Sequence, residues 1–264
     1  MLTWLITGLI AVVISSIGFK KYVWFISIGY GFSVAGIGVG LLILERNALT
    51  IGTLLGCILF ILYGCRLGGY LAYREIRSGT YNSKMKTEIK SGKGMSIVAK
   101  IAIWLSAALL YAFETSPMTF RLVNKEGTDV VLIVGLCISL AGVLLESIAD
   151  IQKNNAKKKN PKRFVDTGLY KLVRCPNYFG EMLFWTGVFV GGIPIYYDAV
   201  QWVVAILGYV GIIYVMFGGA RRLEIRQNKY YGEDPEYQKY VKTTPIMIPF
   251  IPLYSVEKYK WFVA

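Results

Sequence analysis

Acidic and amide side chains at helical spacing inside apolar stretches are the first candidates for chemistry in this chain. Glu146 and Asp150 are four residues apart at the end of one apolar stretch, so a helix places both carboxylates on one face. Asn177 and Glu181 repeat this spacing directly after Pro176, a residue type that favours the start of a helix. Ionisable groups inside apolar segments are costly and mark candidate sites by default. The two pairs therefore predict one polar pocket. The competing interpretation is that they pair with one another and only hold helices together.

A basic stretch between the two pairs completes a site for a phosphate-bearing ligand. It reads KNNAKKKNPKR (residues 153–163) and includes Lys157 and Arg163. Because a free carboxylate repels a phosphate, we assign Asp150 and Glu181 to ribose hydroxyls or a carboxamide and the cations to phosphates. Backbone N–H groups at the start of a helix favour the same oxygens. A dinucleotide needs this combination. The simpler interpretation of the basic stretch is a solvated loop beside anionic lipid.

The composition limits which residues can do chemistry. Histidine is absent, which removes the commonest general acid–base residue and the commonest metal ligand. The four cysteines include no CxxC pair, and three of them lie inside apolar stretches. We therefore expect no metal site and no disulfide framework. Any catalysis must use tyrosine, carboxylate, lysine or a cofactor.

The elements that position these residues are membrane helices. Hydrophobic residues make up 55% of the 264-residue chain, and the mean hydropathy is +0.50, above the range of soluble domains. A helix that crosses a bilayer core needs about 20 apolar residues, and seven segments approach that length: 1–19, 22–44, 49–72, 96–116, 130–149, 178–193 and 200–219. The first lacks the charged start of a cleavable signal peptide, so we expect a retained helix. The sequence predicts an all-α, polytopic membrane protein with about seven transmembrane helices.

The distribution of positive charge predicts the orientation. With the N-terminus outside, the outer loops carry only Arg46, Arg121 and Lys125, and Arg66 lies inside a segment, which leaves 25 of the 29 Lys and Arg residues on the cytoplasmic side. This asymmetry predicts an N-out, C-in topology. It also accounts for the net charge of +13 without a nucleic-acid partner. Membrane lipids are the expected surroundings.

Three stretches in the C-terminal half resemble a known family. They are ESIADIQK (146–153), RFVDTGLYKLVRCPNYFGE (163–181) and RRLEIRQNKYYGEDPEYQKYVKTTPIMIPF (221–250). Together they resemble the C-terminal domain of steroid 5α-reductases, and most closely the bacterial DUF1295-type branch of relatives of unknown function. The resemblance implies a cofactor-binding region at 130–264 and a substrate side at 1–129. It implies that NADPH is held by Asp150, Arg163, Asn177 and Glu181, with contributions from Arg221, Glu224 and Asn228. Glu146 and Lys157 join this set from the spacing described above.

A weaker match lies upstream. YGCRLGGYLAYR (63–74) resembles the third-helix stretch of that family and makes Tyr63 the candidate acid that donates to a substrate carbonyl. The alternative is an aromatic residue packed in the bundle. The chain departs from the family at two points: Cys175 precedes Pro176 where the family usually has histidine, and Glu45 is the only acid near the second segment, where steroid-reducing members carry a glutamate.

The resemblance implies an NADPH-dependent reductase of a C=C bond conjugated to a carbonyl in an apolar, sterol- or isoprenoid-like lipid. A membrane methyltransferase of the isoprenylcysteine type, with S-adenosylmethionine, is the first alternative. The basic stretch argues against it, because S-adenosylmethionine carries no phosphate. A non-catalytic lipid-binding or transport protein is the second alternative. A bacterial plasma membrane is the expected location rather than the endoplasmic reticulum, because the most similar branch is bacterial.

Overall fold

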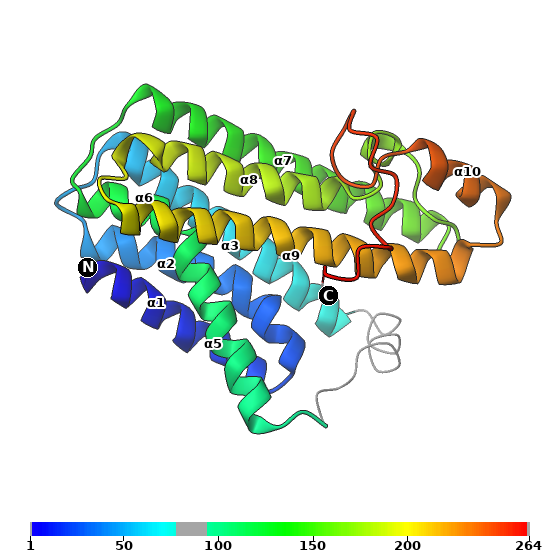
Figure 1. The fold of residues 1–264 in the computed structure, drawn as a ribbon, viewed down its shortest axis with the longest axis horizontal. Helices are drawn as coiled ribbons and strands as arrows, with labels where there is room; N and C mark the ends of the chain where they lie inside the picture. The colour runs from blue at the N-terminus through cyan, green and yellow to red at the C-terminus, as the bar shows by residue number, and fades with distance from the viewer. Residues whose placement is uncertain (1, 78–93, 263–264) are drawn as a thin grey trace. The chain divides into compact units, whose positions relative to one another are not determined.

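The computed structural model describes residues 2–77 and 94–262, and all regular structure in these ranges is helical (Figure 1). The α-helices are α1 (Leu2–Ser15), α2 (Ile28–Leu44), α3 (Ile51–Arg77), α5 (Ile97–Glu114), α6 (Ser116–Val123), α7 (Val130–Lys159), α8 (Pro176–Gly192), α9 (Ala199–Tyr231) and α10 (Pro235–Thr243). Short 3-10 helices are η1 (Ser16–Phe19), η2 (Tyr22–Ile26), η3 (Gly168–Lys171) and η4 (Ile193–Ile195). Four of the basic residues used in the charge count lie outside the described residues: Lys84, Lys86, Lys90 and Lys93.

Seven helical segments within the described ranges are long and apolar enough to cross a membrane. Each overlaps one of the seven predicted segments, so the prediction of an all-α chain with about seven membrane helices is confirmed. These segments indicate an integral, multi-pass membrane protein.

Three of the helices continue past their apolar stretches. The sequence predicted a basic loop from Lys153, but α7 continues to Lys159. Lysine and alanine are good helix formers. Three lysines lie in the last turn of α7, where their positive charges interact favourably with the negative end of the helix dipole. Similarly, α3 extends to Arg77 and α9 to Tyr231. Polar helical turns therefore extend beyond the membrane-spanning lengths.

The chain divides into two compact units. Unit 1 comprises residues 1–136 and 188–209, and unit 2 comprises 137–187 and 210–264. Each of α7, α8 and α9 contributes residues to both units. All the contacts described below lie within one unit.

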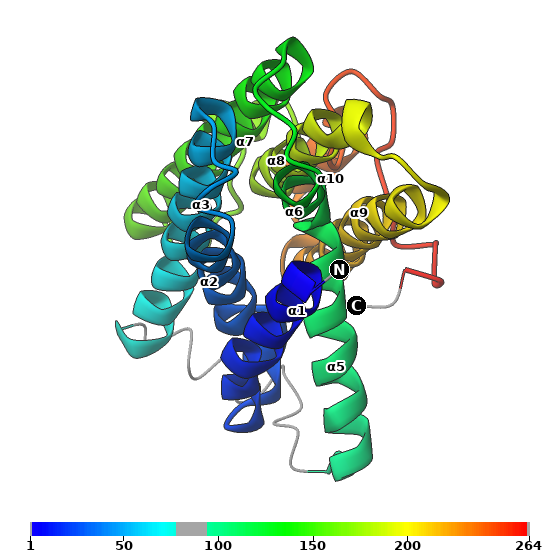
Figure 2. The same cartoon turned by 90° about the vertical axis from the view of Figure 1, so that its left-hand side faces the viewer.

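In unit 1, α2 and α3 approach each other through glycine. A Cβ on Gly31 would lie 2.5 Å from the backbone nitrogen of Gly68 and 2.9 Å from the carbonyl oxygen of Gly64. Small residues permit such close packing between membrane helices. Helix α1 contacts both α2 and α5 in the same unit (Figure 2). The backbones of α2 and α3 are therefore closely packed at these glycines.

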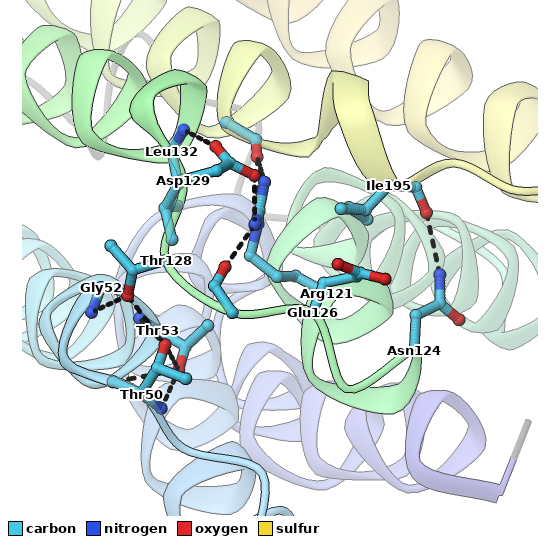
Figure 3. A network of polar contacts seen from close by, with 12 residues as sticks. Thr50, Gly52, Thr53, Arg121, Asn124, Glu126, Thr128, Asp129, Leu132 and Ile195 are labelled. Atoms are coloured by element: carbon cyan, nitrogen blue, oxygen red, sulfur yellow. Dashed lines mark hydrogen bonds and ion pairs between the residues drawn. The ribbon is translucent and has the colours of Figure 1, made fainter.

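The buried side chain of Arg121 fixes the position of the loop that follows α6 (Figure 3). The side chain of Arg121 is 1% exposed, and its guanidinium donates to the carbonyl oxygens of Gly191 and Gly127 and pairs with Asp129 at 2.8 Å. Asp129 in turn accepts the backbone N–H of Leu132 at 2.7 Å. Partial burial by itself raises the pKa of Asp129, but Leu132 and Arg121 outweigh it and hold that pKa below its ordinary value. The network joins α6, the start of α7 and the end of α8.

Candidate functional site

The two polar pairs come together on α7 and α8 in unit 2. The helices run antiparallel there, since Ser139 donates to the carbonyl oxygen of Phe184 at 2.8 Å, and a Cβ on Gly180 would lie 2.7 Å from the backbone nitrogen of Glu146. Glu181 is adjacent to Gly180, so its helix turn lies against that of Glu146. The antiparallel register then places Asp150, one turn further along α7, level with the first turn of α8.

The members of this group differ in burial. Because the sequence predicts that they form one polar pocket, we name the group the α7–α8 pocket: Glu146, Asp150, Asn177 and Glu181. Glu146 and Glu181 are buried, whereas Asp150 and Asn177 are partly exposed. The side-chain oxygen Oδ1 of Asn177 is enclosed, and within the described chain it has no hydrogen-bond partner. A buried acceptor of this kind calls for an explanation such as an absent ligand. A ribose hydroxyl or a carboxamide N–H has the donor that Asn177 lacks, so the residues present fit a nucleotide cofactor.

The segment before α8 is paired with the chain after α10. The backbone N–H groups of Arg174 and Cys175 donate to the carbonyl oxygens of Pro245 and Ile246, each at 2.9 Å. Cys175 is 2% exposed, and this burial raises the pKa of its thiol from 9.0 to about 11. The thiol therefore stays protonated at neutral pH and is a poor nucleophile. Cys175 acts here as a small core residue.

The two basic residues predicted to bind phosphates have internal partners. Lys157 donates to Tyr231 at 2.8 Å and also contacts the carbonyl oxygen of Arg163. The guanidinium of Arg163 pairs with Asp166 and Glu236, whose side chains are 28% and 67% exposed. Exposed ion pairs of this type contribute about 0–1 kcal/mol. Arg163 can therefore exchange its carboxylates for a phosphate at small cost, whereas Lys157 is held more firmly.

Glu224 belongs to a buried ion pair. Its Oε1 lies 2.8 Å from Nη2 of Arg174, and the two side chains are 3% and 1% exposed. Its Oε2 accepts the backbone N–H groups of Val256 and Glu257 at 2.8 and 2.9 Å, while Arg174 also contacts the carbonyl oxygen of Tyr254. The carboxylate is thus engaged on both oxygens, and it positions the chain after α10. Arg174 was not predicted as a site residue, because its only signal in the sequence is a cation directly before a Cys-Pro pair.

Arg221 and Asn228, also on α9, contact the same part of the chain. Arg221 donates to the carbonyl oxygens of Glu257 and Phe262. The Asn228 amide donates to the Glu257 carboxylate at 2.6 Å, and its oxygen accepts from the Tyr237 hydroxyl at 2.7 Å. Burial raises the pKa of Tyr237 to about 12, so this tyrosine remains a hydrogen-bond donor. Three residues of α9 therefore fix the position of the chain after α10: Arg221, Glu224 and Asn228.

Tyr63 is a residue of α3 in unit 1, and its side chain is fully buried. Its hydroxyl is 3.0 Å from that of Tyr30 on α2, and the Tyr30 ring lies 5.0 Å from the ring of Tyr111 on α5. Tyr30 was not predicted as a site residue, because nothing local distinguishes it among the 19 tyrosines. The hydrogen bond between the two hydroxyls positions that of Tyr63 in a buried setting. Glu45, by contrast, lies at the end of α2 and accepts from Thr3 at 2.5 Å.

The fold and the α7–α8 pocket define a class: a polytopic helical membrane protein with a group of polar residues where α7 and α8 face each other. The chain belongs to the family described as Protein of unknown function (DUF1295), whose model matches residues 13–244. No curated protein and no solved structure matches the chain. The family assignment therefore extends over both units and brings no activity with it.

Proposed function

We propose that the protein is a membrane-embedded, NADPH-dependent reductase of an apolar enone, with its cofactor on unit 2. The observation that carries this proposal is the α7–α8 pocket, in which an enclosed Asn177 oxygen without a described partner and three carboxylates belong to the facing turns of α7 and α8. Carboxylates and amides bind ribose hydroxyls and carboxamides. NADPH would supply a hydride. The substrate is proposed to be a sterol- or isoprenoid-like lipid that enters from the bilayer.

Within this proposal the side chains have separate tasks. Asp150, Asn177 and Glu181 bind the cofactor's hydroxyl and amide groups, with Glu146 supporting them from α7. Arg163 turns from its exposed carboxylates to a phosphate, and Lys157, Arg221, Glu224 and Asn228 hold the surrounding chain, as their contacts suggest.

Tyr63 donates a hydrogen bond to the substrate carbonyl oxygen as negative charge develops there. Tyr30, whose hydroxyl lies 3.0 Å away, orients that donor.

We also propose the N-out, C-in orientation, because 25 of the 29 Lys and Arg residues would then be cytoplasmic. This places the α7–α8 pocket at the cytoplasmic side, where reduced nicotinamide cofactors are available. A bacterial plasma membrane is the proposed location.

A methyltransferase that uses S-adenosylmethionine is the second candidate, and one observation favours it. Phosphate binding was the reason to prefer NADPH, yet Lys157 and Arg163 both have partners within unit 2. A ligand without phosphates would leave these contacts in place. The pocket's carboxylates and amide suit the ribose and amino groups of either ligand.

Ligand-induced stabilisation distinguishes the candidates. We expect NADPH to raise the melting temperature of the purified, detergent-solubilised protein, by the equivalent of ~2.7 kcal/mol at 100 times its Kd. Asp150→Ala and Asn177→Ala should each abolish the shift, because they remove cofactor contacts. Glu233→Ala, an exposed carboxylate on the same unit, is the matched control and should keep it. NADH and S-adenosylmethionine are tested in parallel. A shift with S-adenosylmethionine alone would favour the methyltransferase, and no shift with any of the three would favour a non-catalytic lipid-binding or transport protein.

Tyr63→Phe should separate cofactor binding from reduction. We expect the variant to keep the NADPH-induced shift but to oxidise NADPH about 10²–10³-fold more slowly with an apolar enone, the usual effect of losing one donor to a developing oxyanion. Tyr30→Phe should slow the reaction about fivefold, the equivalent of one ordinary hydrogen bond. Tyr73→Phe, an exposed tyrosine on the same helix α3, is the control. Unchanged turnover in Tyr63→Phe would exclude this tyrosine as the acid.

A further inference from the structure

The chain after α10 forms a loop (residues 245–252) with a buried base and an exposed apolar tip. Ile246 and Met247 are 1% and 0% exposed, whereas Phe250 and Ile251 are 96% and 49% exposed. The base is closed by the Ile246 N–H, which donates to the carbonyl oxygen of Leu253 at 2.8 Å. The loop is therefore anchored in unit 2, while at its tip Phe250 is almost fully exposed and Ile251 is about half exposed.

The loop lies level with the edge of the membrane. Its base pairs with Arg174 and Cys175, the two residues directly before the sixth candidate span, which begins at Pro176. A residue that immediately precedes a membrane-spanning helix lies near the membrane–water boundary. The exposed tip thus belongs at the depth of lipid headgroups.

The backbone of Phe250 is strained. Its φ of 65° lies in the left-handed region, which bulky residues rarely adopt. Such conformations persist only where the surrounding structure enforces them, and they cluster at functional sites. Pro249 and Pro252 on either side restrict the backbone further. The loop is held so that an apolar ring projects outward.

A groove of about 250 Å³ adjoins the tip. Phe250, Pro252 and Tyr254 line one part of it, and Lys171 and Leu172 from the end of η3 line another. The groove is below the ~300–1,000 Å³ of typical ligand pockets, too small for a dinucleotide or a sterol. Its lining residues include one cation, Lys171, and no carboxylate. An apolar wall beside a single exposed cation matches the headgroup and upper chain of an anionic phospholipid.

We propose that the 245–252 loop and Lys171 form a binding site for an anionic phospholipid, with Phe250 and Ile251 inserted at the headgroup–acyl boundary and Lys171 bound to the lipid phosphate. Insertion of apolar side chains together with attraction of a basic group is the general way in which surface elements bind anionic membranes. The site is separate from the α7–α8 pocket, and the inference stands whether or not the protein is a reductase.

The test uses the full-length purified chain in a neutral detergent, titrated with phosphatidylglycerol, phosphatidylcholine or soluble glycerol phosphate while the melting temperature is followed. We expect phosphatidylglycerol to stabilise the protein more than phosphatidylcholine, and glycerol phosphate to have no effect. Lys171→Gln should weaken the apparent affinity for phosphatidylglycerol about fivefold, equivalent to ~1 kcal/mol per basic residue at an anionic surface. Lys260 is an exposed cation of the chain after α10 that does not line the groove. Lys260→Gln should leave the affinity for phosphatidylglycerol unchanged.

Phe250→Gly separates lipid binding from folding. Glycine accepts a positive φ without strain, so the variant should be at least as stable as the parent protein in detergent alone and yet lose most of the stabilisation by phosphatidylglycerol. A large loss of stability without lipid would show that Phe250 is a structural residue and would overturn the proposal. The proposal is also overturned if Lys171→Gln responds like the parent, or if glycerol phosphate alone reproduces the effect.

Discussion

Glu224→Ala should lower the free energy of unfolding by about 3–5 kcal/mol, because it leaves the Arg174 guanidinium buried without its counter-charge. Both side chains are at most 3% exposed, so water cannot replace the lost partner. The same change removes the acceptor for the N–H groups of Val256 and Glu257. We therefore expect a lower thermal midpoint in detergent and faster proteolysis of the chain after Thr243.

Two variants control for this interpretation. Asp166→Ala removes a partly exposed partner of Arg163 and should cost about 1 kcal/mol or less. The double variant Arg174→Met, Glu224→Met removes both charges and should recover much of the stability, since replacing a buried pair by apolar groups is often neutral. A single Glu224→Ala variant as stable as Asp166→Ala would show that the pair is not shielded from water.

Gly180→Val should have the second large effect. A Cβ at this position would lie 2.7 Å from the backbone nitrogen of Glu146 and 2.8 Å from the carbonyl oxygen of Gly142. Backbone atoms cannot rotate away, so α7 and α8 must separate, at a cost of about 1–3 kcal/mol or more. Because this contact also aligns the carboxylates of the α7–α8 pocket, the variant should lose its response to NADPH. Both the thermal midpoint and the ligand-induced shift report the outcome.

Gly69→Ala is the matched control. No atom lies within 4 Å of the Cβ that would be added there, and alanine is favoured over glycine inside a helix by roughly 0.5–1 kcal/mol. This variant should therefore be slightly more stable than the parent and respond normally to ligands. Equal stability of Gly180→Val and the parent would contradict the close approach of α7 and α8.

The spans were predictable because each is a continuous apolar stretch, and hydropathy reports such a stretch without any tertiary information. That Glu146 and Asp150 share one helix face, and that Asn177 and Glu181 share another, also followed from local helical spacing. The end of α7 was not predictable in this way. Lysines 157 to 159 look like a solvated loop when only charge is considered, although their helix propensity and the helix dipole both favour the last turn.

Ion pairs between residues far apart in the sequence could not be predicted from local sequence patterns. Arg174 and Glu224 are 50 residues apart, and Arg163 and Glu236 are separated by 73. Periodicity describes one helix at a time and carries no information about which remote carboxylate neutralises a cation. Arg121 shows the same difficulty, since the charge count placed it in an outer loop whereas its guanidinium is buried. The predicted phosphate-binding role of Lys157 and Arg163 stays a prediction for this reason.

The anchoring of the chain after α10 also affects how the protein is made. The backbone N–H groups that satisfy Glu224, and the carbonyl oxygens that accept from Arg174 and Cys175, all belong to residues that leave the ribosome after the seven spans. Until those residues emerge, a nascent chain inserted in the membrane carries an arginine and a glutamate whose partners are incomplete. Unit 2 therefore completes these contacts only once residues 245–257 have been synthesised.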